Sequence, residues 1–383
     1  MANNNDKKVL NVPGLRFPEF ADKWEKGYFK DVCKITTGNK NTQDKDGNGL
    51  YPFYVRSQNI ERINSWTFDG EAILTAGDGV GVGKVFHYSI GKIGVHQRVY
   101  ILSNFKCDGK YLYQYFSSRF YNRVKRMSAK NSVDSVRMEM IADMPLYLPS
   151  VGEQHKIGKL LALLDERIST QNKIIEKLQS LIKGIVDELM TVLLKGKLYP
   201  FSSFYIKAGE GGTPTTSVNE YYLGGTIPFI KIEDLSCKYL TSNKDFITEL
   251  GMQKSSAWLI PSHSVIYSNG ATIGAISINE YPICTKQGIL GIVPNTNINV
   301  EYLYLLMSSS YFSKEVNRIV TEGTMKTAYL KDINHIKCPL PSMAQQQNIT
   351  NLTSSIEKKL FVEQELLKLL NIQKQHLLRT MFI

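Results

Sequence analysis

The chain has 383 residues, of which 43% are hydrophobic and 21% are charged. This composition provides enough apolar side chains for two ordinary cores and excludes a disordered chain. Lys and Arg outnumber Asp and Glu by 46 to 35, and the resulting net charge of +11 favours a polyanionic partner.

The cysteines and the apolar runs exclude further classes. The five cysteines lie far apart and form no C-x-x-C pair, so neither structural zinc nor a disulfide framework is expected. Residues 1–8 lack the apolar segment of a signal peptide, and no run approaches the ~18 apolar residues that span a bilayer. We therefore expect a cytoplasmic protein with no membrane partner.

Residues 1–150 have the pattern of a mixed α/β (α+β) domain, in which short β-rich runs alternate with glycine turns before a helix. The expected elements are strands at Ala72–Leu74 and Gly94–Leu102, a helix at Tyr111–Met127, a polar loop with Asn131-Ser132, and a strand ending in Leu148-Pro149-Ser150.

Residues 151–196 predict a first long helix. Ser150 and Glu153 have the spacing of a capping box, and Gly196 is expected to stop the helix. Roughly forty residues at ~1.5 Å each would extend about 60 Å. Two heptad positions are apolar, which is typical of a coiled-coil seam: Leu161, Ile168, Ile175, Ile182 and Leu189 on one, and Ile157, Leu164, Leu178, Ile185 and Val192 on the other, with Gln171 as the exception.

The second half repeats this plan, because Leu340-Pro341-Ser342 follows Leu148-Pro149-Ser150 at a distance of 192 residues (340 − 148). The sequence thus predicts a second domain at 197–341 and a second long helix at 342–383. Its expected elements are strands at Ser264–Tyr267 and Gly288–Val293, a helix at Glu301–Val320, and a polar loop with Gly323-Thr324.

Two further segments align between the halves. Residues 54–60 align with 229–235, and the Tyr-Leu-Tyr at 111–113 aligns with that at 302–304. The long helices match closely and the globular parts diverge, as expected for a shared scaffold that carries two differently tuned recognition modules.

The second long helix repeats both the cap and the stripe of the first. Ser342 and Gln345 reproduce the capping box, and we expect the two helices to pair, with Gln171 and Glu363 on the seam. The alternative is that each helix packs only on its own domain. The stripe consists of Ile349, Ile356, Leu360, Leu367, Leu370, Leu377 and Met381, interrupted by Thr353, Glu363 and Lys374.

Several motifs, in this order and with the doubled helix, resemble the specificity subunits of type I restriction-modification enzymes. They are Arg16-Phe17-Pro18-Glu19-Phe20 with Trp24, Gly211-Gly212-Thr213-Pro214, the run from Gly224 to Lys231 with Asp234-Leu235, and Pro339-Leu340-Pro341 before Gln345-Gln346. The resemblance covers essentially the whole chain. The first half departs from it, since Thr37-Gly38-Asn39 stands where Gly-Gly-Thr-Pro is expected.

The resemblance implies a reader of bipartite double-stranded DNA that catalyses nothing and holds no metal. Each globular half would be a target-recognition domain for one half-site, and two antiparallel helices would set the spacer between them. Two methyltransferase (modification) subunits would bind, and restriction (motor-nuclease) subunits would join. The chain itself would need no cofactor, because S-adenosylmethionine, ATP and Mg would be bound by the partner subunits.

Phosphate contacts are expected on two basic segments, 117–137 and 308–331. The first contains few acids, whereas a solvated surface usually mixes both signs. The alternative is a solvated basic helix face. The candidates are Arg119, Arg123, Lys125, Arg126, Lys130 and Arg137 in the first segment, and Lys314, Arg318, Lys326 and Lys331 in the second.

Base contacts are expected from polar loop residues, because Arg pairs well with guanine and Asn or Gln with adenine. The alternative for each residue is a turn cap. The candidates are Arg56, Ser57, Gln58, Asn59, Lys84 and Arg98 in the first half, and Thr213, Thr215, Lys231, Ser268, Asn269, Lys286 and Gln287 in the second.

Enzyme motifs fail on inspection. Gly77–Lys84 lacks two required residues of a Walker loop and predicts a tight strand turn, and the stretch from Asp143 to Tyr147 lacks a proline of an amino-methyltransferase motif. Glu357-Lys358-Lys359 resembles the end of a nuclease motif but has no carboxylate partner at a suitable place. The six histidines are scattered, so no metal site is expected. The remaining alternatives are an autonomous DNA- or RNA-binding protein and a basic coiled-coil scaffold for acidic proteins.

Overall fold

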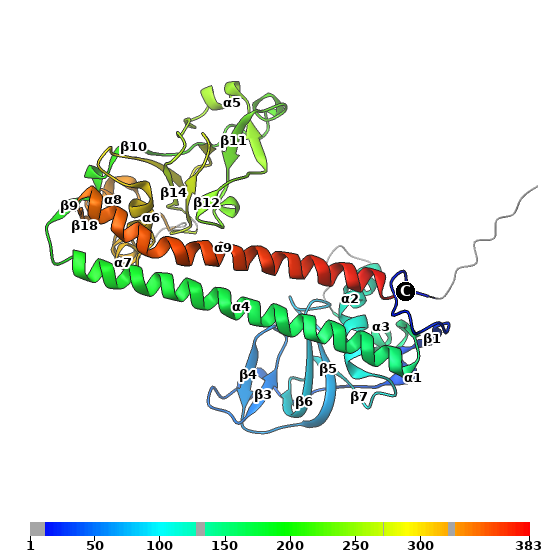
Figure 1. The fold of residues 1–383 in the computed structure, drawn as a ribbon. Coiled ribbons are helices and arrows are strands. Elements are labelled where there is room, and N and C mark those ends of the chain that lie inside the picture. The colour runs from blue at the N-terminus through cyan, green and yellow to red at the C-terminus, as the bar shows by residue number, and fades with distance from the viewer. Residues whose placement is uncertain (1–11, 128–134, 271, 321–325) are drawn as a thin grey trace, which may run out of the picture. The chain divides into compact units, whose positions relative to one another are not determined.

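The computed structural model describes residues 12–127, 135–270, 272–320 and 326–383. These residues form two compact units (Figure 1). Unit 1 takes the chain up to Asn172 together with Glu365–Ile383, and unit 2 takes Lys173–Gln364. The sequence predicts boundaries after residues 150, 196 and 341, where one element ends and the next begins. The two units are instead defined by which residues pack together, so each unit contains part of each long helix. The predicted loops with Asn131-Ser132 and Gly323-Thr324 lie outside the described residues.

Unit 1 contains a first module that runs from β1 to β8. Its elements are β1 (Glu25–Tyr28), α1 (Phe29–Val32), β2 (Lys34–Thr37), β3 (Tyr51–Tyr54), β4 (Ile60–Ile63), β5 (Phe68–Ala76), β6 (Phe86–Val95), β7 (Val99–Ser103), α2 (Gly109–Met127), α3 (Met138–Ala142) and β8 (Pro145–Leu148).

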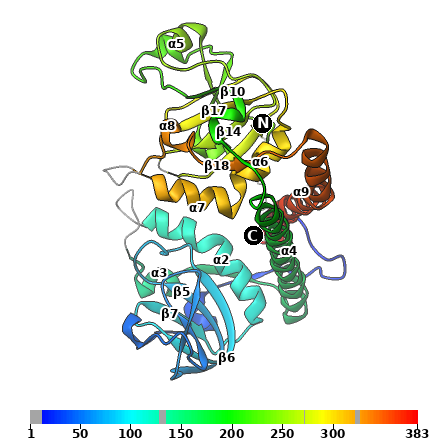
Figure 2. The same cartoon turned by 90° about the vertical axis from the view of Figure 1, so that its left-hand side faces the viewer.

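A six-stranded sheet in the order β2-β7-β5-β6-β3-β4 forms the frame of the first module. All its pairs are antiparallel except β3 with β6. Helix α2 packs beside β5 to β7, where Tyr111, Phe116 and Phe120 share a buried core with Ile73 and Leu102 (Figure 2). A separate ladder of β1 with β8 lies beside α2, since the Tyr111 and Tyr115 hydroxyl groups donate to the Tyr147 and Pro145 carbonyl oxygens of β8.

The prediction of one strand over Gly94–Leu102 is wrong. Strands β6 and β7 lie on opposite sides of β5, so the chain has to turn between them. It turns at His96–Arg98, where the Val99 N–H donates to the His96 carbonyl oxygen over 2.9 Å. The flanking valines give an uninterrupted β pattern, which hides this turn from the sequence.

Unit 2 contains a second module that runs from β9 to β18. Its elements are β9 (Leu198–Pro200), β10 (Tyr205–Glu210), β11 (Ile227–Ile230), β12 (Tyr239–Leu240), β13 (Asp245–Ile247), α5 (Glu249–Gln253), β14 (Val265–Ser268), β15 (Ile276–Asn279), β16 (Cys284–Thr285), β17 (Ile289–Pro294), α6 (Val300–Ser308), α7 (Ser310–Ile319), α8 (Leu330–Ile333) and β18 (Lys337–Pro339).

The second module repeats the strand order of the first, but its sheet is split. A five-stranded sheet has the order β10-β17-β14-β15-β12, and a three-stranded sheet has the order β13-β11-β16. The long strand β6 of the first module corresponds to two short strands here, β15 and β16, because both carry the equivalent pairings. A closing ladder of β9 with β18 matches that of β1 with β8.

The predicted alignment of residues 54–60 with 229–235 is wrong by one position. The parallel pairs place Phe53 opposite Gly94 and Phe229 opposite Cys284, so Phe53 corresponds to Phe229. Both phenylalanines are buried. The residues that follow them, Tyr54 and Ile230, are also buried, so the apolar pattern of the sequence does not reveal this shift of one position.

The prediction of a single helix over Glu301–Val320 is also wrong, because the helix is interrupted at Ser309, between α6 and α7. The Ser309 hydroxyl accepts the Phe312 N–H over 3.2 Å and donates to the Leu306 carbonyl oxygen over 2.6 Å. Serine side chains compete with helix backbone bonds in this way and favour a new N-cap. The predicted helix at Tyr111–Met127 is confirmed by α2.

The two long helices are α4 (Val151–Leu193) and α9 (Met343–Thr380). The second capping box is confirmed, since the Ser342 N–H donates to Gln345 Oε1 (3.0 Å) and the Gln345 N–H to Ser342 Oγ (3.4 Å). In the first, the Glu153 carboxylate has a different partner from the one predicted. It accepts two hydrogen bonds of 2.7 Å from the Arg16 guanidinium group.

Both units contain an antiparallel pair formed by segments of α4 and α9. In unit 1, Ile157 and Leu161 of α4 share a core with Met381, which follows α9. In unit 2, Val186 and Met190 of α4 share a core with Ile349 of α9. The alternative in which each helix packs only on its own domain is therefore wrong.

The predicted stripe holds over most of both helices. Gln171 is 5% exposed and Glu363 is 7% exposed, so neither lies in bulk solvent. The stripe fails at Val192, which is 63% exposed, while Val186 and Met190 are buried instead. A straight helix drifts by ~20° per heptad from a seven-residue repeat, and the buried face has therefore rotated by this point.

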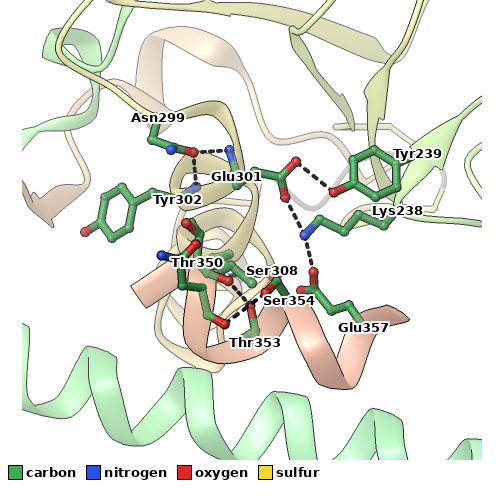
Figure 3. Close-up of polar contacts among 12 residues, drawn as sticks. Lys238, Tyr239, Asn299, Glu301, Tyr302, Ser308, Thr350, Thr353, Ser354 and Glu357 are labelled. Atoms are coloured by element: carbon green, nitrogen blue, oxygen red, sulfur yellow. Dashed lines mark hydrogen bonds and ion pairs between the residues drawn. The ribbon is translucent and has the colours of Figure 1, made fainter. Parts of the chain in front are cut away.

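An insertion in the second module, residues 231–244, contacts the long helix α9. The Lys238 ammonium group pairs with Glu357 of α9 over 2.6 Å and also pairs with Glu301 of α6 (Figure 3). The Tyr239 hydroxyl donates to Glu301 over 2.9 Å, and burial raises the pKa of Tyr239. The insertion is thus tied to both helices.

Candidate nucleic-acid interface

Four loops of the first module meet at one edge of its sheet. They connect β2 to β3, β3 to β4, β5 to β6, and β6 to β7, and they line a polar cavity of about 540 Å³. The lining side chains include Asn41, Gln43, Arg56, Asp78, Gln97 and Arg98. All six can donate to or accept from a base edge, so this cavity is the candidate nucleic-acid interface of unit 1.

Two of the predicted base contacts, Arg56 and Arg98, are brought together here by Asp78. Arg56 Nη1 donates to Asp78 Oδ1 over 2.9 Å, and Arg98 Nε lies 3.6 Å from Asp78 Oδ2. The Arg98 side chain is 65% exposed and that of Arg56 is 46% exposed. We refer to these three residues as the Arg–Asp–Arg cluster.

Glycines hold this cluster in place. A Cβ atom at Gly81 would lie 2.3 Å from the Arg56 carbonyl oxygen, so only glycine allows the two loops to approach. The Gly77 N–H donates to the Arg98 carbonyl oxygen over 2.8 Å. The tight turn predicted for Gly77–Lys84 is confirmed, and its glycines serve loop packing.

His96 lies beside the cluster, and its hydrogen bonds indicate a neutral imidazole ring. Its Nδ1 accepts the Arg98 backbone N–H over 3.0 Å, which places the ring proton on Nε2, 3.3 Å from Thr42 Oγ1. Burial and the positive charge of Arg56 and Arg98 lower the pKa of His96. Sequence reasoning missed His96 and Asp78, because both lie in turns whose partners are distant along the chain.

The second module has different residues at the equivalent positions. The Asn269 N–H donates to the Gly288 carbonyl oxygen over 3.0 Å, as the Gly77 N–H does to Arg98. Gly270 and Gly288 therefore correspond to Asp78 and Arg98. A Cβ atom at Gly270 would lie only 3.3 Å from Gly288 Cα, so two glycines pack together where the first module has an ion pair.

Gly38 of the first module is the structural equivalent of Gly211, although Thr37-Gly38-Asn39 stands there in place of Gly-Gly-Thr-Pro. The Gly38 N–H donates to the Val99 carbonyl oxygen over 3.0 Å, and the Gly211 N–H donates to that of Ile289 over 2.9 Å. A Cβ atom would lie 2.2 Å from the Val95 oxygen in one case and 2.1 Å from the Thr285 oxygen in the other. The close approach needs only this one glycine.

The other predicted base contacts of the first module lie apart from the Arg–Asp–Arg cluster. Ser57 Oγ donates to the Asn59 carbonyl oxygen over 3.1 Å, and both residues are exposed. Gln58 lines a separate cavity of about 340 Å³ together with Asp165. The Lys84 ammonium group lies 5.3 Å from the centre of the Tyr121 ring.

In the second module, Ser268 and Asn269 lie in the interior with 0% exposure. The Lys231 ammonium group pairs with Asp245 over 2.9 Å. Thr213 Oγ1 accepts the Gln287 N–H over 3.5 Å. The side chains of Thr215, Lys286 and Gln287 are exposed.

The predicted phosphate contacts of the first module fall into two groups. The Arg119 guanidinium group lies 5.1 Å from the centre of the Tyr115 ring, and Arg123 donates to the Met140 and Asp143 carbonyl oxygens, so both support the core. The Arg123 pKa is lowered by burial. Lys125, Arg126 and Arg137 are exposed, and Lys130 lies outside the described residues.

The corresponding residues of the second module lie on its surface. Lys314 and Lys326 are exposed, Arg318 pairs with Glu315 within α7, and Lys331 lies 5.5 Å from the centre of the Tyr329 ring. No group of three or more His, Cys, Asp or Glu side chains among the described residues could hold a metal ion. Within those residues, no helix is long and apolar enough to cross a bilayer.

Comparison with known proteins agrees with this arrangement. Residues 21–180 and 205–371 match the family model described as the type I restriction modification DNA specificity domain. The chain is 20% identical to the EcoDI specificity subunit of Escherichia coli, over 85% of this chain and 79% of that protein. It is 23% identical to the MjaVIII specificity subunit of Methanocaldococcus jannaschii, over 94% and 91%.

The fold also matches solved structures. The crystal structure of a type I restriction-modification S subunit from M. genitalium superimposes with a TM-score of 0.65 at 17% identity, over 97% of this chain and 99% of that chain. The two matches to a DNA specificity domain, one in each half of the chain, define a DNA sequence-recognition subunit. The chain belongs to the family of type I restriction-modification specificity subunits. It is the non-catalytic subunit of such an enzyme, and it works in complex with DNA and with other subunits that carry the enzymatic activity.

Proposed function

We propose that this subunit reads a bipartite target in double-stranded DNA, with one half-site contacted by each module. One observation carries the proposal: the two modules share a frame but differ at the loops that would face DNA. The first has the Arg–Asp–Arg cluster where the second has Gly270 and Gly288. Since loops of different chemistry present different donors and acceptors, the two half-sites should differ in sequence.

The proposed DNA contacts are a subset of the exposed members of the predicted set. Base edges would be read by loop residues, and phosphates would be held by basic residues of the segments that follow the sheets. The base contacts are Arg56, Arg98, Thr215, Lys286 and Gln287, and the phosphate contacts are Lys125, Arg126, Arg137, Lys314, Lys326 and Lys331.

We further propose that two copies of one methyltransferase subunit bind the long helices. Each unit exposes apolar side chains at positions that correspond in the repeat. Val151 is 70% exposed and its counterpart Met343 is 45% exposed, while Leu160 and Leu352 are 37% and 52% exposed. Exposed apolar residues at repeated positions favour two identical docking sites for identical partners.

The remaining chemistry would belong to the partners. Restriction (motor-nuclease) subunits would join the larger enzyme, and S-adenosylmethionine, ATP and Mg would be bound outside this chain. We place the assembly in the cytoplasm, where the DNA to be modified lies.

Co-expression with the candidate methyltransferase tests this assembly. We expect a complex with two methyltransferase copies per specificity subunit, whose mass falls by one copy in Val151→Glu or Met343→Glu. Replacing the exposed Gln179 with glutamate serves as the control and should leave the mass unchanged. A complex that retains both copies in the two apolar-site variants would contradict the proposed docking sites.

Sequencing of methylated DNA from a host with the intact system tests the bipartite target. We expect two half-sites of different sequence at one fixed separation. Binding should also weaken as salt rises, with a slope of about −0.9 for each phosphate engaged in log–log form. A single continuous target, or binding that is independent of salt, would contradict the proposal.

A further inference from the structure

We propose that the Arg–Asp–Arg cluster reads a G·C base pair in the half-site of the first module, with Asp78 as a specificity-determining residue. This inference rests on the proposed function, because it requires the first module to contact duplex DNA. It adds the identity of the base pair and the role of a residue that sequence reasoning assigned only to a turn.

The ion pairs of the cluster use only some of its donors. Asp78 engages Nη1 of Arg56 and Nε of Arg98, and each guanidinium group carries further N–H donors in a rigid planar fork. One carboxylate between two guanidinium groups leaves one net positive charge at the mouth of the cavity. The cluster therefore favours an electron-rich acceptor edge.

Guanine presents such an edge in the major groove. Its O6 and N7 atoms accept two hydrogen bonds from one arginine, and the paired cytosine offers its N4 amino group to a carboxylate. A cluster that combines arginine donors with a carboxylate acceptor thus complements both halves of a G·C pair. Adenine turns its N6 amino group toward the arginine instead, which leaves a donor facing a donor.

The backbone keeps Asp78 in position before any ligand binds. Gly77 is bound on both sides, since its N–H donates to the Arg98 carbonyl oxygen (2.8 Å) and its own carbonyl oxygen accepts the Val136 N–H (2.7 Å). Gly79 has a φ of +78°, which a side chain would strain. Preorganised donors and acceptors discriminate better than mobile ones, because less ordering occurs on binding.

The second module supplies an internal control. Gly270 and Gly288 stand at the equivalents of Asp78 and Arg98, and they carry no side chain that could read a base. Changes at Asp78 or Arg98 should therefore alter specificity at the first half-site and leave the second unchanged.

The test uses the complex of the specificity subunit with its methyltransferase and a library in which one half-site at a time is randomised. Four variants are compared with wild type: Asp78→Asn, Arg98→Ala, Arg98→Lys and, as control, Lys26→Ala at an exposed position on β1. We expect the wild-type complex to require a G·C pair at a position of the first half-site. Arg98→Ala and Asp78→Asn should reduce discrimination at that position by about ten-fold to a hundred-fold.

Arg98→Lys separates base reading from phosphate binding. Lysine keeps the charge but loses the planar fork, so a base-reading Arg98 predicts lost discrimination with largely retained affinity. Equal weakening on all sequences in Arg98→Ala, with full recovery in Arg98→Lys, would overturn the inference and make Arg98 a phosphate contact. A first half-site without any required G·C pair would also overturn it. Neither result affects the proposed bipartite target, which is contradicted instead by a single continuous target or by binding of the wild-type complex that is independent of salt.

Discussion

Replacing Lys238 with methionine tests how the second module is anchored to its long helix. The substitution keeps the apolar stem and removes the ammonium group, which pairs with Glu357 over 2.6 Å and also with Glu301. The two carboxylates would then face each other without a cation. Since the ammonium group also lies 5.2 Å from the centre of the Tyr304 ring, the aromatic contact is lost as well.

The magnitude follows from the burial of the three side chains. Lys238 is 14% exposed, Glu357 is 15% exposed and Glu301 is 26% exposed. Exposed ion pairs contribute about 0–1 kcal/mol, whereas removing one partner of a buried pair costs about 3–5 kcal/mol. This cluster lies between the two cases, so Lys238→Met should lower the free energy of unfolding by about 2 kcal/mol.

Denaturant unfolding of the full chain measures this loss, and a double-mutant cycle isolates the pair. In the cycle of Lys238→Met with Glu357→Gln, the double variant should be more stable than the sum of the single losses by about 1 kcal/mol. Lys358→Met, at an exposed neighbouring position on α9, is the matched control and should change stability by less than about 0.5 kcal/mol. Strict additivity in the cycle would refute the reasoning.

Three further predictions concern stability. Burial and the nearby arginines lower the pKa of His96 below 6.5 in the folded protein. The unfolded chain therefore binds more protons at His96, so the free energy of unfolding should fall as the pH drops below about 6.5. A His96→Gln variant whose stability has the same pH profile as wild type would contradict this. Gly211→Ala places Cβ 2.1 Å from a carbonyl oxygen of β16 and should lower the free energy of unfolding by about 2–3 kcal/mol, measured by thermal unfolding. In the same assay, Gly184→Ala, which adds a Cβ atom in open space, should stabilise α4 by about 0.5–1 kcal/mol. Asp187→Ala removes the carboxylate that accepts the Ser310 N–H (2.8 Å) and hydroxyl group (2.6 Å) in the first turn of α7, and it should lower the free energy of unfolding by about 1–3 kcal/mol. Glu188→Ala, at an exposed neighbouring position, should leave stability unchanged. Equal losses in the two variants would show that these hydrogen bonds do not anchor α7.

The repeat and the long helices were predictable from sequence because their signals are periodic. Capping at Ser342 and the apolar stripe involve residues close together along the chain, and the structure confirms both. The failures occurred where a distant contact decides the outcome. Arg16 binds the Glu153 carboxylate from 137 residues away. The stripe fails at Val192 for a different reason, because the buried face of the helix has rotated by that point.

The candidate interface was only partly predictable for the same reason. Residue type alone indicates Arg56 and Arg98 as base contacts, but nothing local in the sequence indicates that Asp78 lies between them. That contact depends on three loops that meet because Ala76 pairs with Val99 and Tyr54 pairs with Val95. Ser268 and Asn269 illustrate the reverse case, since a polar pair at the end of a strand looks the same in the sequence whether it is buried or exposed.

The two modules are fixed to the long helices through one acidic position with different partners. Asp165 and Glu357 are 192 residues apart (357 − 165) and stand at the same place in the repeat. Asp165 accepts the Gln114 side chain of α2 over 2.6 Å, whereas Glu357 reaches α6 through Lys238 of the insertion. In each unit, the acid thus ties the helix beside the sheet to a long helix. A surface that must present donors to base edges needs such rigid support, and exchanging the partner while keeping the acid allows a common scaffold to carry two different readers.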